Sequence, residues 1–158
     1  MIKIAKYVSV ALLVIGLMFG VAYQFRTDPI AMLAGKRVSG QEQPYPDDRL
    51  FSNEHMTVAV ETRPDNPHSV TTLGIVHNGT LYIPAQSGST KKWPQYVLAD
   101  SRVRIKIGDK VYPVKATREL DLSVDEIVSS GAAKYPRFAE IEPEDRPRDV
   151  WLFRISQR

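Results

Sequence analysis

One loop of this 158-residue chain combines the residue types that bind anions. The run Pro84-Ala-Gln-Ser-Gly-Ser-Thr-Lys-Lys-Trp93 leaves a predicted strand, passes through small hydroxylated residues and enters a predicted helix. Its backbone N–H groups, its hydroxyls and the ammonium groups of Lys91 and Lys92 could together hold a phosphate. The rings of Trp93 and Tyr96 could stack on a planar ligand. The alternative is a solvated loop whose lysines face water or anionic lipid.

The rest of the sequence offers few groups at catalytic or metal-binding spacing. His55, His68 and His77 are scattered, and none has a partner at the spacing of a metal site. The chain has no cysteine, no Walker loop and no G-x-G-x-x-G, which excludes zinc ribbons, thiol nucleophiles and the nucleotide sites that such loops build. We therefore predict no metal site and leave the catalytic residues unassigned.

The charge of the chain argues against nucleic acid as a partner. Of the 21 basic residues, Lys3 and Lys6 precede an apolar N-terminal run, which leaves 19 basic against 18 acidic residues from Arg26 onward. A net charge of +1 over that part of the chain is not the footprint of a nucleic-acid-binding protein. The roughly 130 residues after the apolar run suit one domain with its own core.

Two hairpins are predicted on either side of the loop. In the first, Asn78-Gly79 joins residues 69–77 to residues 80–85, because both central residues of a type I′ turn need a positive φ. This register places Val76 opposite Leu81. The second hairpin covers residues 102–117, with Gly108-Asp109 at its turn and apolar residues alternating with basic ones. Such ribbons are typical of a barrel wall.

Further strands and helices are predicted around these hairpins. Residues 56–62 form a strand rich in β-branched residues, and Val150 to Ile155 form an apolar final strand. About two turns of helix follow Trp93. Ser123 and Glu126 form a capping box that opens another helix. This order of elements predicts a small antiparallel barrel with helices over its ends.

The N-terminal segment is predicted to span a membrane once. Val8 to Phe25 carries no formal charge, and 18 residues at about 1.5 Å each nearly cover the ~30 Å hydrocarbon core of a bilayer. This predicts a single-pass protein of the cell membrane with the lipid bilayer as a partner. The alternative is a signal peptide cleaved after Ala22. Gly16 and Gly20 have the spacing at which two helices in a membrane approach closely.

The chain is accordingly predicted to have three parts. Residues 1–26 form the transmembrane anchor. Residues 27–53 form a juxtamembrane segment, with a short helix capped by Asp28 and then a linker rich in Gly, Ser, Gln and Pro. Residues 54–158 form the barrel domain.

Three runs of the sequence carry a family resemblance. PHSVTTLGIVHNGTLYIPA, KKWPQYVLADSRVRIKIGDKVYPVKATR and the closing VWLFRI together resemble the split-barrel flavin-binding proteins, the pyridoxamine-phosphate-oxidase-like group. They look most similar to its deazaflavin-dependent nitroreductase and quinone-reductase branch, and the match covers Met56 to Ile155. The resemblance implies a mainly β (α+β) fold, a six-stranded antiparallel split barrel with short helices, here preceded by the transmembrane helix.

The resemblance also implies which residues bind a cofactor, flavin mononucleotide or a deazaflavin. Strand residues would contact the ring, and loop residues would surround the phosphate tail. The ring residues are Ser69, Thr71 and Thr72, and the tail residues are Gln86, Ser87, Lys91, Lys92 and Trp93.

The implied function is a membrane-anchored oxidoreductase that transfers hydride to a quinone-like or nitro-type acceptor, with a lipid-soluble acceptor as a partner and a homodimer as the assembly. The cofactor would supply the hydride chemistry. The family usually has a Gly-Arg/Lys-x-Ser-Gly turn where this chain has the run Arg63-Pro-Asp-Asn-Pro-His68. This departure leaves open a second function, a non-catalytic membrane-tethered split-barrel protein that binds or scaffolds.

Overall fold

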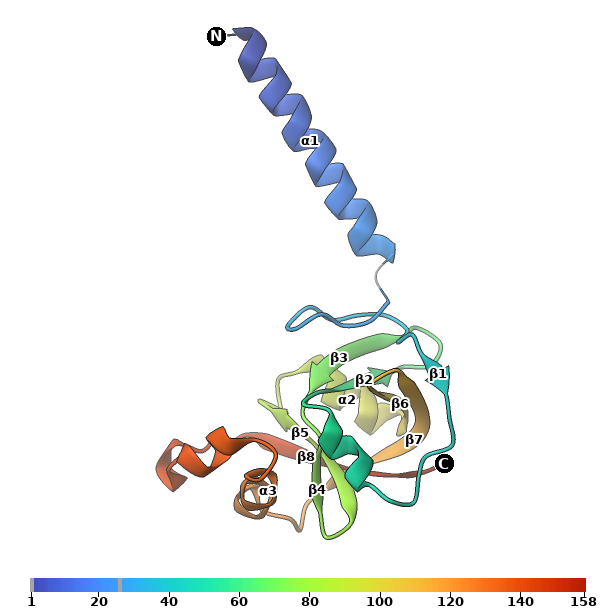
Figure 1. Ribbon diagram of the computed structural model, residues 1–158, viewed down its shortest axis with the longest axis vertical. Coiled ribbons are helices and arrows are strands. Elements are labelled where there is room, and N and C mark those ends of the chain that lie inside the picture. The colour runs from blue at the N-terminus through green and yellow to red at the C-terminus, as the bar shows by residue number, and fades with distance from the viewer. Residues whose placement is uncertain (1, 26) are drawn as a thin grey trace.

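The computed structural model describes residues 2–25 and 27–158, with the side chains of residues 2–6, 22 and 25 left out. Figure 1 shows the helices and strands of the described chain. They are α1 (Ile2–Phe25), β1 (Gln41–Glu42), η1 (Leu50–Glu54), β2 (Val58–Thr62), β3 (His68–Thr72), β4 (Ile75–His77), β5 (Thr80–Gln86), α2 (Lys92–Ala99), β6 (Arg102–Ile107), β7 (Lys110–Glu119), α3 (Val124–Gly131), η2 (Pro136–Glu140), η3 (Pro143–Asp145) and β8 (Val150–Gln157).

The strands within the described residues form one eight-stranded sheet, not the six-stranded sheet predicted. Its order is β3-β2-β6-β7-β8-β5-β4, all antiparallel, and β1 adds a short parallel pairing to β7. Since β3 and β4 stand at opposite ends of this order but adjoin in sequence, the sheet curls into a barrel. A hydrogen bond from the Thr72 hydroxyl to the Pro84 carbonyl at 3.0 Å crosses between β3 and β5.

The strand count was wrong for two physical reasons. The predicted strand 69–77 breaks at Leu73-Gly74, so β3 pairs with β2 while β4 pairs with β5. A Cβ at Gly74 would come within 2.7 Å of the Val58 side chain, so the break occurs where two parts of the chain approach closely. The second reason is β1, which lies in a segment that has no strand-like pattern of its own.

The turns of both predicted hairpins and the predicted capping box are confirmed, although in the first hairpin only Ile75 to His77 pair across the turn. Val76 pairs with Leu81, and Asn78 and Gly79 have φ of 47° and 71°, as a type I′ turn requires. The second turn places Ile107 opposite Lys110. In α3, the Ser123 and Glu126 side chains each accept from the other's backbone N–H.

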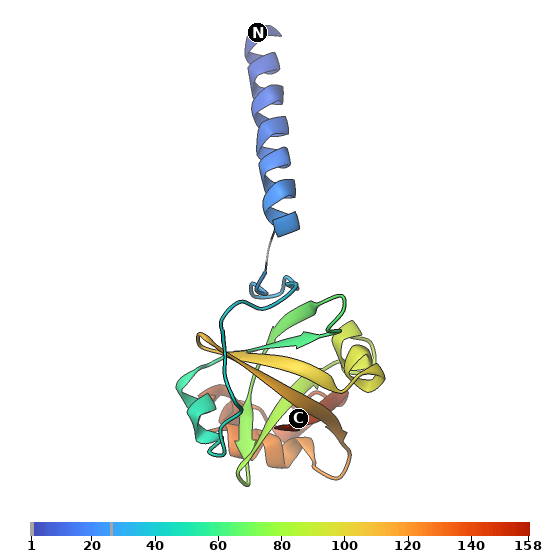
Figure 2. The ribbon, with the colours of Figure 1, turned by 90° about the vertical axis from the view of Figure 1, so that its right-hand side faces the viewer.

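Two clusters of buried side chains hold the fold together. The larger fills the barrel with residues of β2 and β5–β8, and Trp93 and Val97 of α2 close one side of it. The smaller lies outside the barrel, where Ile75, Tyr82 and Leu152 pack against Ile127 of α3. Helix α3 and the chain after it therefore cover the outside of β4 and β8 (Figures 1 and 2).

The predicted membrane span is contradicted. Helix α1 extends away from the barrel (Figures 1 and 2), and no helix among the described residues has the length and apolar character needed to cross a bilayer. The prediction had placed this span at Val8 to Phe25. The single-pass membrane localisation and the bilayer partner depended on that span and are corrected with it.

The segment after α1 lies along the barrel instead of forming a short helix and a linker. Residues 30–33 form a tight turn, β1 pairs with β7, and Val38 and Tyr45 are buried. Figure 2 shows this segment running along the outside of the barrel. We call residues 28–45 the arm. The division of the chain at residues 26 and 53 stays a prediction.

Candidate functional site

A cavity of about 850 Å³ lies beside the barrel, between three groups of elements. One wall comes from β3, the end of β5 and the start of α2. A second wall comes from α3 and the chain between η2 and β8. The arm supplies the third wall through residues 31–34. Since ligand pockets typically measure about 300–1,000 Å³, this cavity is large enough for a cofactor.

Six of the eight predicted site residues line this cavity. They are Thr71, Thr72, Gln86, Lys91, Lys92 and Trp93. Thr71 and Thr72 are half-buried on β3, whereas Gln86 and the two lysines are exposed. The structure thus brings the strand and loop residues to one cavity, although their predicted roles toward a cofactor remain a prediction.

Ser69 lies away from the cavity, beneath the arm. Its backbone pairs with Gly35, with Gly35 N–H donating to the Ser69 carbonyl at 2.8 Å and Ser69 N–H donating to the Gly35 carbonyl at 3.1 Å. Its side chain is fully buried, and its hydroxyl has no hydrogen-bond partner among the described residues. A Cβ at Gly35 would come within 2.5 Å of this hydroxyl, so the arm covers Ser69 closely.

The loop around Ser87 is bound to the chain's own Asp149. The Asp149 carbonyl accepts from Ser87 N–H at 2.6 Å, and its carboxylate accepts from Ser89 N–H at 3.1 Å and from the Ser89 hydroxyl at 2.6 Å. Ser87 has a φ of 57°, a left-handed conformation that this closed turn imposes. These N–H groups and this hydroxyl are therefore already used, and neither Ser87 nor Asp149 lines the cavity.

The two aromatic residues expected to stack on a ligand have different surroundings. Trp93 is 5% exposed, and its ring packs against Phe153 in the barrel with centroids 5.3 Å apart. Trp93 therefore belongs to the core of the barrel and also lines the cavity. Tyr96 does not line the cavity, and its ring contacts His68 and the guanidinium of Arg63.

Several lining residues were not found from the sequence. His68 lines the cavity from β3, and α3 contributes Val124, Ile127 and Val128. The sequence predicted this helix from its capping box, but nothing there indicated that its apolar residues would border a cavity. Glu140 and Asp145 lie on the exposed rim of the same wall.

The cavity therefore has an apolar interior and charged ends. Its interior is lined by Val70, Leu73, Ile75, Ile127 and Phe138, and the two ammonium groups lie on the side of α2. Such a site can bind a flat apolar ring and hold an anionic substituent beside Lys91 and Lys92.

Comparison with known proteins gives likenesses of fold. No model of a known protein family matches the chain, and no curated protein matches it by sequence. A candidate pyridoxamine 5'-phosphate oxidase from Listeria innocua is 21% identical over 70% of this chain and 91% of its own, with a TM-score of 0.51. HutZ, a heme storage protein from Vibrio cholerae, is 11% identical over 68% of this chain and 85% of its own, with a TM-score of 0.52. The conserved hypothetical protein Rv2991 from Mycobacterium tuberculosis is 18% identical over 68% of this chain and 76% of its own, with a TM-score of 0.52.

The chain has the split-barrel fold of the pyridoxamine-5'-phosphate-oxidase-like proteins. The resemblance seen in the sequence is confirmed at that level. Two of the proteins that share this fold are described as a candidate pyridoxamine 5'-phosphate oxidase and as a heme storage protein.

Proposed function

We propose that this protein binds a flavin mononucleotide or a deazaflavin in the cavity and uses it to transfer hydride to a quinone-like or nitro-type acceptor. The observation that carries this proposal is the placement of six predicted cofactor residues around one cavity with an apolar interior and a cationic end. The likeness of the fold to a candidate pyridoxamine 5'-phosphate oxidase supports it.

The residues of the cavity fit such a cofactor. Val70 and Ile75 offer apolar surface to a ring, and the hydroxyl of Thr71 can exchange hydrogen bonds with a polar ring edge. Lys91 and Lys92 are placed to neutralise an anionic tail. Because Asp149 occupies the N–H group and hydroxyl of Ser89, the tail would be held by side chains rather than by a backbone cradle.

When bound, the cofactor supplies the hydride chemistry, so the protein needs no ionisable catalytic residue. The chain's own contribution is to bind and orient. The walls of β3 and α3 would fix the plane of the ring, and their apolar side chains would exclude water from it. The lysines would set which end of the ligand points toward α2.

The test is a titration of flavin mononucleotide and of the deazaflavin F420 into the wild type and into Lys91→Ala/Lys92→Ala. Charge-assisted contacts contribute about 1.5–3 kcal/mol each, so we expect the double variant to bind at least about tenfold more weakly, with a larger difference at low salt. The matched control is Lys110→Ala/Lys115→Ala, which removes two exposed lysines of β7 that lie outside the cavity lining. Equal binding by wild type and the Lys91/Lys92 variant would show that the tail is held elsewhere.

A second function, binding without catalysis, is supported by Asp149. The Asp149 carboxylate accepts the hydrogen bond from Ser89 N–H, so this donor is not free for a phosphate. HutZ, which shares the fold, is described as a heme storage protein. Hemin titration together with turnover of menadione by the cofactor-loaded protein separates the two functions. Tight hemin binding without menadione reduction would favour the binding protein. The homodimer stays a prediction.

A further inference from the structure

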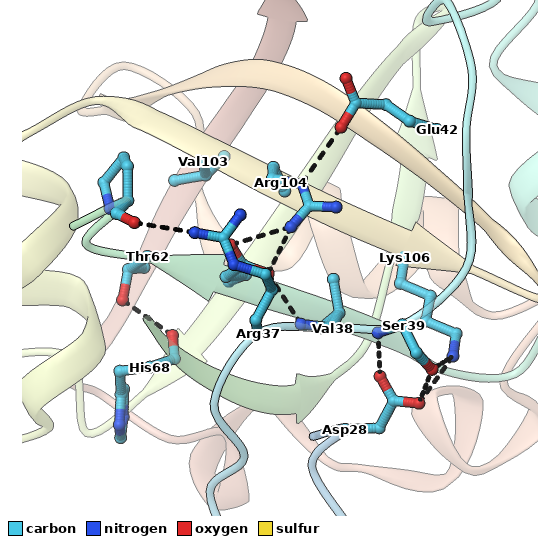
Figure 3. Close-up of polar contacts among 12 residues, drawn as sticks. Asp28, Arg37, Val38, Ser39, Glu42, Thr62, His68, Val103, Arg104 and Lys106 are labelled. Carbon is cyan, nitrogen blue, oxygen red and sulfur yellow. Dashed lines mark hydrogen bonds and ion pairs between the residues drawn. The ribbon is translucent and has the colours of Figure 1, made fainter. Parts of the chain in front are cut away.

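The first part of the arm is a closed loop whose two ends meet. The Asp28 carboxylate accepts from Ser39 N–H at 2.7 Å, from the Ser39 hydroxyl at 2.6 Å and from the Lys106 ammonium group at 2.8 Å (Figure 3). Residues 28–39 therefore form a compact surface loop of the Ω type, fixed to β6 at its neck. Surface loops with this construction frequently carry function.

The loop is also fixed along its length. Val38 N–H donates to the Glu61 carboxylate at 2.7 Å, and Gly35 pairs with Ser69 of β3. Figure 3 shows the contacts of Val38 and Ser39 side by side above β2 and β6. These contacts hold the tip of the loop, residues 30–34, at the cavity.

The tip presents apolar side chains that nothing in the described chain covers. Ile30 and Leu33 exchange backbone hydrogen bonds at 3.0 and 2.9 Å, and Ala31 between them has a φ of 50°. Met32 is 100% exposed, Ile30 66% and Leu33 60%. Met32 and Leu33 line the cavity, whereas Ile30 does not.

We propose that the tip of this loop is a ligand-binding wall, and that a flat apolar ligand lies between Met32 and Leu33 on one side and β3 on the other. The inference uses the cavity of the proposed function and adds to it a part of the site that precedes the barrel. We expect a ligand, rather than another protein, to cover the tip, because the tip is continuous with the apolar interior of the cavity. A stable protein interface buries about 800 Å² on each partner, far more than three side chains at one turn provide.

The experiment compares Met32→Ser and Leu33→Ser with the matched control Ile30→Ser. All three side chains are exposed, so each variant should keep the melting temperature of the wild type. Two probes are titrated into each protein, flavin mononucleotide and the aromatic anion 8-anilinonaphthalene-1-sulfonate. We expect Met32→Ser and Leu33→Ser to bind each probe about five- to tenfold more weakly, since burial of such side chains stabilises a complex, and Ile30→Ser to bind like the wild type.

The outcomes test the proposal that the loop tip is a ligand-binding wall separately from the proposal that the cavity binds a cofactor. If the naphthalene probe depends on Met32 and Leu33 while flavin mononucleotide binds to no protein, the wall stands and the flavin function fails. If both probes bind and all variants are equal, the wall is refuted and the cofactor function stands. Failure of both probes to bind the wild type refutes the wall and the flavin mononucleotide form of the proposed function. A change of oligomeric state in Met32→Ser or Leu33→Ser, measured by sedimentation, would show that a second copy covers the tip and would also refute the wall.

Discussion

Replacement of Glu61 should destabilise the fold more than any ordinary surface change. The Glu61 carboxylate is 2% exposed, and both its oxygens lie within 3.1 Å of Nη1 of Arg104, its cross-strand partner on β6. It also accepts from Val38 N–H. Glu61→Ala removes the closer of the two carboxylates beside the Arg104 guanidinium, which is 17% exposed and keeps the exposed Glu42 at 3.5 Å, and it also removes the acceptor of the buried Val38 N–H group. Breaking one side of such a pair costs about 3–5 kcal/mol.

The assay is urea unfolding with a calorimetric melting curve. At about 2–4 °C per kcal/mol for a chain of this size, Glu61→Ala should lower the melting temperature by about 6–20 °C. The double variant Glu61→Leu/Arg104→Met removes both charges and should lie closer to the wild type, because no unpaired charge stays buried. A loss below about 1 kcal/mol in Glu61→Ala, or a double variant as unstable as the single one, would refute this reasoning.

Two further predictions concern the hairpin turn and the neck of the arm. Gly79→Val should cost about 1–2 kcal/mol in urea unfolding, because a β-branched residue must adopt φ near 71° in open space, whereas Gly79→Asn should cost less. Equal urea midpoints for Gly79→Val and Gly79→Asn would show that the positive φ of this residue is not the cause of the loss. Burial raises the pKa of Asp28, but hydrogen bonds from Lys106 and Ser39 outweigh this and hold its pKa below the ordinary 3.8. The stability that Asp28 adds is therefore complete above about pH 4 and is lost as the pH falls through its lower folded pKa, so the unfolding free energies of wild type and Asp28→Ala should converge only in that acidic range.

The elements that the sequence predicted correctly are those with local causes. The type I′ turn depends on two adjacent residues that tolerate positive φ, and the capping box of α3 depends on two residues three positions apart. The arm has no such local pattern. Val38 and Tyr45 are buried in a segment rich in Gly, Pro and Gln, and their burial follows only from contacts with strands far along the chain. The same is true of β1, whose pairing with β7 the sequence alone does not signal.

The candidate site shows the same limit. The loop and its lysines were recognisable because small hydroxylated residues and two cations adjoin in sequence. The hydrogen bonds between Asp149 and Ser89 could not be recognised in this way, because the two residues lie 60 positions apart. Nor could the burial of Ser69 under Gly35 be foreseen, since it depends on the path of the arm across β3.

The internal hydrogen bonds of the loop between β5 and α2 decide how the site would recognise an anion. Asp149 and the Ser87 carbonyl, which accepts from Lys91 N–H at 3.0 Å, hold the loop in one conformation before any ligand arrives. The backbone at Lys91 is then already ordered, so binding an anion costs less conformational entropy. The ammonium groups of Lys91 and Lys92, however, are exposed, and their attraction for an anion is screened by salt. If the proposed cofactor binds, a site built in this way would hold its anionic tail by charge rather than by a fitted cradle, so its affinity should fall with ionic strength while its preference among anions of equal charge should stay weak.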